Sequence, residues 1–311
     1  MNKIIPIFIA AVIGGGIFGL VLNVFGGFGD DFAANKQLSA NIAQITTNPL
    51  ATDWKQVSPP EIRAVSAVLT EITANGQYNV IWEKKAQQIS PIASLTKLMT
   101  AVIAAEFYQQ NQNITVTKRA TEQLDAAGFL KIGERLNLEN LLEVMLIESS
   151  NDAAFALTEP MGGPNGFVDL MNLKARDLGL NHSYFFNPSG LDPEDTNSPE
   201  EQINYSTAND LVILVQYITF EHPEIVKILS KKELALYLDN GQFHHNLQNT
   251  NELLGQIPNI IWGKTGTTDK AGGCLLLTIK GKSPGTYLVA VVLNSPDKFD
   301  DMKKIIDNYG L

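Results

Sequence analysis

The chain has 311 residues, with 23 Lys and Arg against 33 Asp and Glu and a formal net charge of −10 at pH 7. This length allows one large domain or two smaller ones, each with its own hydrophobic core. An acidic chain without a basic stripe lacks the surface that binds phosphate backbones, so we expect no nucleic-acid partner. Its single cysteine, Cys274, excludes an intrachain disulfide and stands in an apolar run that predicts a core position.

The N-terminal segment indicates a membrane anchor. Residues 4–28 carry no charge, and 25 helical residues span roughly 37 Å against about 30 Å of hydrocarbon. Because Lys3 precedes this run and acidic residues follow it, the N-terminus is expected in the cytoplasm and the rest outside. We therefore expect residues 1–32 to be an uncleaved anchor in the cell membrane, with secretion after signal cleavage as the alternative. The polar stretch 33–60 is expected to be a linker to one folded domain at 61–311.

Strand and helix patterns follow one another along the folded part. Apolar runs at residues 65–72 and 78–82 flank Asn75-Gly76 and predict a β-hairpin. Helical spacing predicts a helix up to Phe107 whose first turn carries Ser94. We expect further helices at 138–147, 153–157, 166–178, 207–218 and 302–309, and further strands at 260–265, 274–280 and 287–293. These elements predict an α+β fold: an antiparallel sheet of N- and C-terminal strands, flanked by helices, with a mostly helical subdomain inserted.

The segment Ser94-Leu95-Thr96-Lys97 suits serine acyl transfer. A serine hydroxyl needs a base within hydrogen-bond reach, and Lys97 lies one helical turn from Ser94. For Lys97 to accept a proton, its pKa must fall by roughly three units from about 10.4, which costs about 4 kcal/mol. Burial and a second cation achieve this, and Lys264 is the candidate cation. A solvated serine and lysine on an exposed helix face would show the same spacing.

The segment Ser149-Ser150-Asn151 stands where one predicted helix ends and another begins. There Asn151 is expected to hold Lys97 and the substrate amide, and Ser149 to pass a proton to the leaving amine. The same residue types also favour an ordinary helix N-cap, so both interpretations stay open.

The segment Lys264-Thr265-Gly266 ends a predicted strand. Lys264 is expected to attract an anionic group, Thr265 to offer a hydroxyl, and Gly266 to let the substrate backbone run alongside the strand. A phosphate-binding loop would need a glycine where Pro258 stands. Zinc-hydrolase spacing is missing from the histidines, which are His182, His222, His244 and His245, so no metal or cofactor is expected. A catalytic triad with a histidine as base stays open.

In this order the three motifs resemble those of the serine-type D-alanyl-D-alanine carboxypeptidases, the low-molecular-mass penicillin-binding proteins. The likeness runs from about Ile62 to Tyr309 and includes Gly133-Glu134, residues 187–191 and residues 264–272. It implies a β-lactamase/transpeptidase-like catalytic domain at 61–311. It also implies roles for site residues, namely Ser94 as acylated nucleophile, Lys97 as base, Ser149 and Asn151 as relay and positioning pair, Lys264 with Thr265 as carboxylate contact, and the N–H groups of Ser94 and Thr267 as oxyanion hole.

The resemblance implies removal of the terminal D-Ala from peptidoglycan stem peptides, with β-lactams acylating the same serine. Lys298 stands where relatives often carry an arginine that helps to hold the terminal carboxylate, and lysine lacks the bidentate fork. An endopeptidase that cuts cross-linked muropeptides is therefore an alternative. A class A-like β-lactamase, with Glu194 as candidate deacylating residue, and a non-catalytic wall-binding scaffold are two others.

Overall fold

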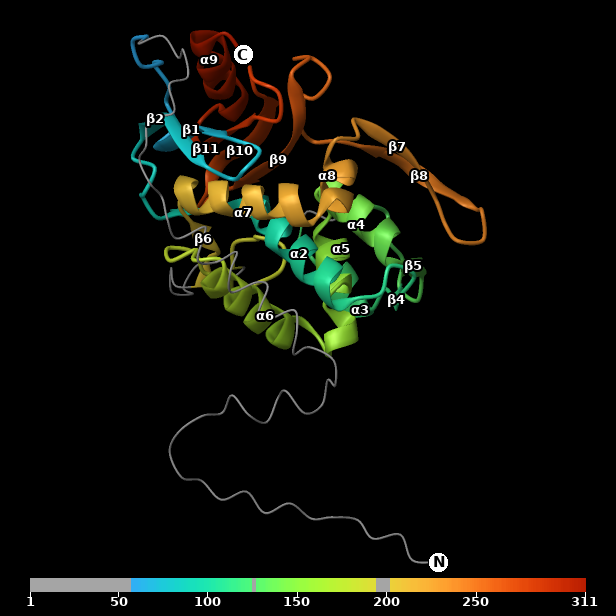
Figure 1. Cartoon of the computed structure of the whole chain (residues 1–311). Helices are drawn as coiled ribbons and strands as arrows, with labels where there is room; N and C mark the ends of the chain where they lie inside the picture. The colour runs from blue at the N-terminus through green and yellow to red at the C-terminus, as the bar shows by residue number, and fades with distance from the viewer. Residues whose placement is uncertain (1–56, 125–126, 194–201) are drawn as a thin grey trace, which may run out of the picture. The chain divides into compact units, whose positions relative to one another are not determined.

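The computed structural model describes residues 57–124, 127–193 and 202–311 (Figure 1). The expected anchor at 1–32 and most of the expected linker lie outside these residues, so the division of the chain stays a prediction. Within the described ranges no helix is long and apolar enough to span a bilayer.

A five-stranded antiparallel sheet joins the two ends of the described chain in the order β2-β1-β11-β10-β9. The predicted hairpin forms around Gly76, whose positive φ of 78° suits a glycine in a tight turn. Ser66 in the first strand pairs with Leu293 in the last, so the expected sheet of N- and C-terminal strands is confirmed (Figure 1). The strands are β1 (Ser66–Ile72), β2 (Tyr78–Lys84), β9 (Ile260–Thr268), β10 (Gly272–Lys280) and β11 (Tyr287–Ser295).

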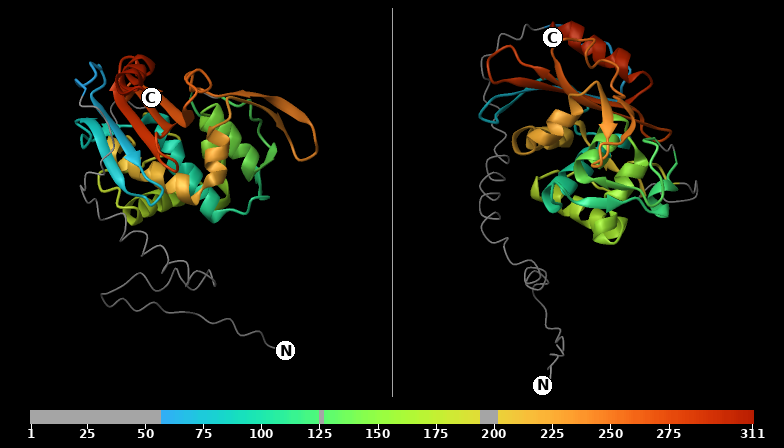
Figure 2. Two further views of the ribbon diagram at one scale, coloured as in Figure 1. Left: turned by 45° about the horizontal axis from the view of Figure 1, so that its top comes forward. Right: turned by 90° about the vertical axis from the view of Figure 1, so that its right-hand side faces the viewer.

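Helices cover both faces of this sheet (Figure 2). On one face Val68 and Ile72 of β1 pack in a cluster that includes α7 (Ala208–Glu221). On the other, Leu69 packs in a second cluster with α9 (Lys298–Tyr309). Burial on both faces explains why β10 and β11 read as continuous apolar runs rather than as alternating ones. Cys274 of β10 is fully buried, as expected.

In the chain, the inserted helical subdomain follows β2 and precedes β9. The expected helices form within a few residues of their predicted bounds. They are α2 (Lys97–Phe107), α4 (Leu138–Ile147), α5 (Asn151–Ala156), α6 (Pro164–Asp177) and α7. The fold is therefore the predicted α+β arrangement.

Several shorter elements have no counterpart among the predicted ones. Their segments are short or polar, so the local sequence does not mark them, and they form through tertiary contacts. These are α3 (Lys118–Thr121), η3 (Glu159–Met161), α8 (Pro223–Leu229) and the strand pairs β3 (Ser90–Pro91) with β6 (Tyr205–Ser206), β4 (Asn113–Thr115) with β5 (Arg135–Asn137), and β7 (Glu233–Tyr237) with β8 (Phe243–Gln248).

Two helix starts differ from the prediction by more than two residues. Ser94 lies in a 3-10 helix, η2 (Ala93–Thr96), and the α-helix begins only at Lys97. This turn is held by a close tertiary contact, because a Cβ on Gly190 would lie 1.9 Å from the carbonyl oxygen of Ala93. The last helix begins at Lys298 rather than Met302, since the Asp297 side chain caps it.

Candidate active site

The nucleophile candidate Ser94 and its base candidate Lys97 face each other. Ser94 lies in the 3-10 helix η2, and Lys97 is the first residue of α2 directly after it, so the two side chains are separated by one helical turn. The Lys97 Nζ lies 2.9 Å from the Ser94 Oγ, within reach for proton transfer. Ser94 is partly exposed, whereas Lys97 is fully buried. A substrate therefore reaches the hydroxyl while the amine stays away from bulk water.

Burial sets the protonation of Lys97. Desolvation, reinforced by the positive charge of Lys264, holds the pKa of Lys97 well below its ordinary value. The amine also donates to the Oδ1 of Asn151 at 2.7 Å and to the carbonyl of Ser189 at 2.7 Å. These two acceptors keep its nitrogen beside Ser94. A neutral Lys97 in this position can accept the serine proton.

In the turn between α4 and α5, one residue caps the helix and its two neighbours face the site. Ser150 is the N-cap of α5, accepting from the N–H of Ala153 at 3.1 Å, and its hydroxyl donates to the carbonyl of Ala127 at 2.5 Å. Its neighbours Ser149 and Asn151 thus remain available for the site. Ser149 has a φ of 65°, a left-handed conformation that costs roughly 1–2 kcal/mol for a non-glycine residue.

Ser149 meets the strand side of the site through Lys264. The Nζ of Lys264 donates to the Ser149 Oγ at 2.8 Å and to the carbonyl of Thr265 at 3.1 Å. Burial, reinforced by the charge of Lys298, lowers the pKa of Lys264 to about 7. Lys264 therefore changes charge close to neutral pH.

Strand β9, which carries the Lys264-Thr265-Gly266 segment, is an edge strand of the sheet. A Cβ on Gly266 would lie 2.9 Å from the backbone N of Ser94, so a glycine here allows the strand to approach the nucleophile closely. The Ser94 N–H, expected in the oxyanion hole, thus lies against this strand. Thr267, whose N–H is the other expected donor, follows directly and is exposed.

Lys298 reaches the same strand from α9. Its Nζ donates to the Thr267 Oγ1 at 2.6 Å, and the Thr267 hydroxyl donates to the carbonyl of Gly266 at 2.7 Å. Burial lowers the pKa of Lys298 from its ordinary value. The structure thus gathers all nine residues that the sequence singles out, which are Ser94, Lys97, Ser149, Asn151, Lys264, Thr265, Gly266, Thr267 and Lys298.

Three residues that support the site were not predicted from the sequence. The Ser189 carbonyl binds Lys97, and the Thr250 hydroxyl lies 2.6 Å from that of Thr265. Asn204 donates to the Thr96 Oγ1 at 2.9 Å, next to the base. The motif at residues 187–191 signalled Ser189 without indicating a role. No sequence signal marks Thr250 or Asn204, because both act across long chain separations.

The histidines lie outside this arrangement. Each ring contacts a carboxylate instead of the Ser94 hydroxyl: His222 contacts Glu106 and Glu224, while the other pairs are His182 with Asp210, His244 with Glu134 and His245 with Glu148. In the described part of the chain, Lys97 rather than a histidine is therefore placed to act as a base beside Ser94. Glu194, the candidate for β-lactamase deacylation, lies outside the described residues.

A nucleophilic serine beside a buried amine, a second serine beside a second amine, and an edge strand together define a serine acyl-transfer enzyme of the hydrolase class. Residues 53–297 match the peptidase S11 family model, described as D-alanyl-D-alanine carboxypeptidase, and the chain belongs to this family.

Known relatives of both cleavage types resemble this chain. A D-alanyl-D-alanine endopeptidase of Escherichia coli is 28% identical over 80% of this chain and 77% of its own length. D-alanyl-D-alanine carboxypeptidase DacF of Bacillus subtilis is 31% identical over 78% of this chain and 60% of its own. Penicillin-binding protein D2 of Listeria monocytogenes, solved in its ampicillin-bound form, aligns with a TM-score of 0.68 at 28% identity over 82% of this chain and 100% of that structure.

Proposed function

We propose that this protein removes the terminal D-Ala from peptidoglycan stem peptides through an acyl-enzyme on Ser94. One observation carries the proposal: the Ser94 Oγ lies 2.9 Å from the Nζ of a buried Lys97 whose pKa is lowered. Family membership adds the substrate class, because the matching family is that of D-alanyl-D-alanine carboxypeptidases.

Acylation begins when neutral Lys97 takes the proton of Ser94 as its Oγ attacks the carbonyl carbon of the penultimate D-Ala. The N–H groups of Ser94 and Thr267 stabilise the negative oxygen, and such a donor typically contributes about 2.7–4 kcal/mol. Ser149 then gives a proton to the departing amine nitrogen and takes in its place the proton held by Lys97, so that free D-Ala leaves and Lys97 is neutral again. In deacylation Lys97 activates a water molecule, which attacks the ester and restores the Ser94 hydroxyl.

Substrate binding is assigned to the strand side of the site. The stem peptide adds to the edge of β9 through main-chain hydrogen bonds, which Gly266 permits by leaving the strand bare. Its terminal carboxylate is held by Lys264, the Thr265 hydroxyl and Lys298. Because Lys264 has a pKa of about 7, this attraction weakens at alkaline pH.

Two assays test the reaction. Incubation with a penicillin, followed by peptide mass spectrometry, is expected to place one adduct on Ser94, as the ampicillin-bound relative suggests. Release of D-Ala from a pentapeptide is expected for the wild type and not for Ser94→Ala. An adduct elsewhere, or equal rates in the two proteins, contradicts the proposal. Equal rates favour the scaffold, and repeated nitrocefin turnover favours a β-lactamase.

An endopeptidase acting on cross-linked muropeptides is the second candidate. A carboxypeptidase must bind the terminal carboxylate of its substrate tightly. Lys298 offers only one nitrogen for this, and that nitrogen already binds Thr267, which favours the endopeptidase. The 28% identity to an E. coli protein named an endopeptidase points the same way. Product analysis on purified peptidoglycan separates the two, since loss of cross-linked dimers without free D-Ala indicates the endopeptidase.

We also propose that residues 1–32 anchor the protein in the cell membrane with the enzyme outside the cytoplasm. The uncharged run at 4–28 and the preceding Lys3 support this orientation. The full chain is expected in the membrane fraction and a chain starting at residue 33 in the soluble one. A mature N-terminus found downstream of residue 28 would instead indicate secretion after cleavage.

A further inference from the structure

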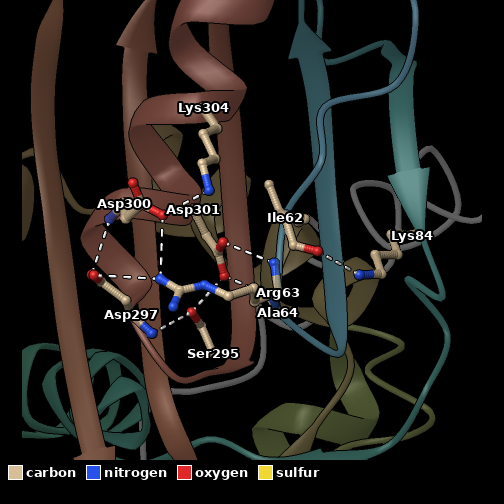
Figure 3. A network of polar contacts seen from close by, with 9 residues as sticks. All are labelled: Ile62, Arg63, Ala64, Lys84, Ser295, Asp297, Asp300, Asp301 and Lys304. Atoms are coloured by element: carbon tan, nitrogen blue, oxygen red, sulfur yellow. Dashed lines mark hydrogen bonds and ion pairs between the residues drawn. The ribbon is translucent and has the colours of Figure 1, made fainter.

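A buried carboxylate binds the last helix to the segment directly before the first strand (Figure 3). Asp301 is fully buried, and its two oxygens accept from three donors. These are the backbone N of Arg63 at 2.9 Å, the backbone N of Ala64 at 2.7 Å and the Oγ of Ser295 at 2.6 Å. A buried carboxylate is tolerated only with such partners, and losing them is costly. We call Asp301 with these three donors the Asp301 clasp.

The clasp acts on the first turn of α9, three residues after Lys298. Within that turn, Asp297 accepts from the N–H of Asp300 at 3.1 Å. Its own N–H donates to the Ser295 Oγ at 3.0 Å. Ser295 therefore belongs to the clasp and also accepts a hydrogen bond from Asp297, the N-cap residue of α9. The start of α9 is thereby tied to the end of β11 and to the entry of β1.

From this turn, the Lys298 side chain crosses β10 to reach β9. A Cβ on Gly273 would lie 3.2 Å from the Cβ of Lys298, so the lysine packs over the bare backbone of this glycine. Gly273 pairs with Thr267 on the neighbouring strand, and Thr267 is the residue that the Lys298 Nζ reaches at 2.6 Å. The Lys298 side chain spans one strand, so the position of the Lys298 Cα decides whether its Nζ reaches Thr267.

We propose that Asp301 is a positioning residue for the acyl-transfer reaction: the Asp301 clasp fixes the start of α9 so that Lys298 reaches Thr267 on the substrate-binding strand. Functional groups need positional support from packed neighbours to within about 0.5 Å, and Asp301 supplies it here. The catalytic part of this inference rests on the proposed function, in which Lys298 helps to hold the substrate carboxylate. The geometric part does not.

The neighbouring acid Asp300 provides a matched control. It lies in the same turn and bears the same charge, but it is exposed and forms only surface ion pairs, with Arg63 at 3.2 Å and Lys304 at 2.8 Å (Figure 3). Such pairs contribute about 0–1 kcal/mol. Asp300→Asn therefore makes the same chemical change as Asp301→Asn but leaves the three clasp hydrogen bonds in place, because Asp300 contacts only the side chain of Arg63 and not its backbone N.

The first readout follows Lys298 itself. The full chain in detergent is labelled with lysine carrying ¹³C at Cε, the Lys298 signal is assigned with Lys298→Arg, and its pH titration is recorded. Burial lowers the pKa of Lys298 in the wild type. Asp301→Asn is expected to return this pKa towards an ordinary lysine value, because the side chain leaves Thr267 for solvent. Asp300→Asn is expected to leave the pKa of Lys298 low.

The second readout is D-Ala release. Asp301→Asn is expected to raise KM about tenfold with kcat within about twofold, since carboxylate binding weakens while the Ser94–Lys97 pair stays intact. In a Lys298→Ala background the same substitution is expected to change KM less than twofold. Independent losses would instead multiply, as they do for a residue that acts only on stability.

The outcomes separate the two proposals. An unchanged Lys298 titration in Asp301→Asn, or losses that multiply in the double variant, overturns the positioning role. No D-Ala release from the wild type, combined with the expected titration change, contradicts the proposed function and leaves the positioning role standing. If Asp301→Asn does not fold, Ser295→Ala decides: it removes one clasp donor and is expected to shift the Lys298 titration in the same direction, by less.

Discussion

The ammonium nitrogen of Lys264 lies 2.8 Å from the hydroxyl oxygen of Ser149, although the two residues are 115 positions apart in the chain. This contact joins the sheet to the helical subdomain at the reaction site. It also places the charge of Lys264 where it lowers the pKa of Lys97, while the charge of Lys298 lowers that of Lys264. Three amines crowded in this way favour proton acceptance by Lys97, and burying them costs stability.

Acylation should depend on pH through two lysines. The rate is expected to rise as pH passes the lowered pKa of Lys97, because only the neutral amine accepts the serine proton. It is expected to fall above about 7, where Lys264 loses the charge that attracts the carboxylate. Stopped-flow acylation by a fluorescent penicillin between pH 5 and about 10 measures both limbs. Lys264→Arg should keep its charge and lose the alkaline fall, and an identical profile would argue against this assignment.

Lys264→Met should stabilise the protein at neutral pH. The pKa of Lys264 is about 7 in the folded protein and about 10.4 when unfolded, so between these values the unfolded state binds more protons. Wild-type stability therefore rises with pH across this window. Below a pH of about 7, where Lys264 is charged in both states, the folded protein carries the full free-energy cost of burying that charge. The variant is expected to gain at most about 5 kcal/mol of unfolding free energy at pH 7, and the gain should shrink by pH 10. Urea denaturation measures both, and parallel pH curves for the two proteins would contradict the prediction.

Adjacent serines should fail in different ways. Ser150→Ala removes the N-cap of α5 and is expected to cost about 0.5–2 kcal/mol of unfolding free energy. Ser149→Ala removes the Lys264 partner and proton relay, so D-Ala release is expected to fall by about 10²-fold at near wild-type stability. Thermal denaturation and peptide turnover on both variants test this division. Equal turnover in Ser149→Ala and wild type would remove Ser149 from the mechanism.

Gly266→Ala should slow acylation more than it unfolds the protein. The new Cβ would lie 2.9 Å from the Ser94 N and 3.1 Å from the Ile92 carbonyl oxygen, which separates β9 from η2. A displacement of about 1 Å at a reacting group costs about 10²-fold in rate. Gly166→Ala is the control, because its nearest contact is 3.8 Å and it stands within α6. The control should acylate at the wild-type rate, and a wild-type rate in Gly266→Ala would show that the strand has room to move.

Local patterns in the sequence indicated the candidate reacting groups and most of the fold. The three-residue spacing of Ser94 and Lys97 is a property of one turn, so it survives the correction from an α-helix to a 3-10 helix. Continuous apolar runs marked β10 and β11, because a strand buried on both faces has no polar alternation, whereas β1 was marked by an alternating apolar run before Asn75-Gly76. The Ser149–Asn151 junction was likewise visible, since helix ends have their own residue preferences.

Tertiary structure decided how these groups are held. That Ser150 caps the helix while its neighbours enter the site depends on the backbone turn at Ser149. The binding of Lys97 to the Ser189 carbonyl, 92 positions away, and of Asp301 to Ala64, 237 positions away, depends on how the layers pack. Local periodicity records a few residues at a time, and contacts of this range arise only when sheet and helices are assembled. The sequence therefore determined which residues are candidates for the reaction, and only the assembled fold decided the burial and support that set their pKa values and positions.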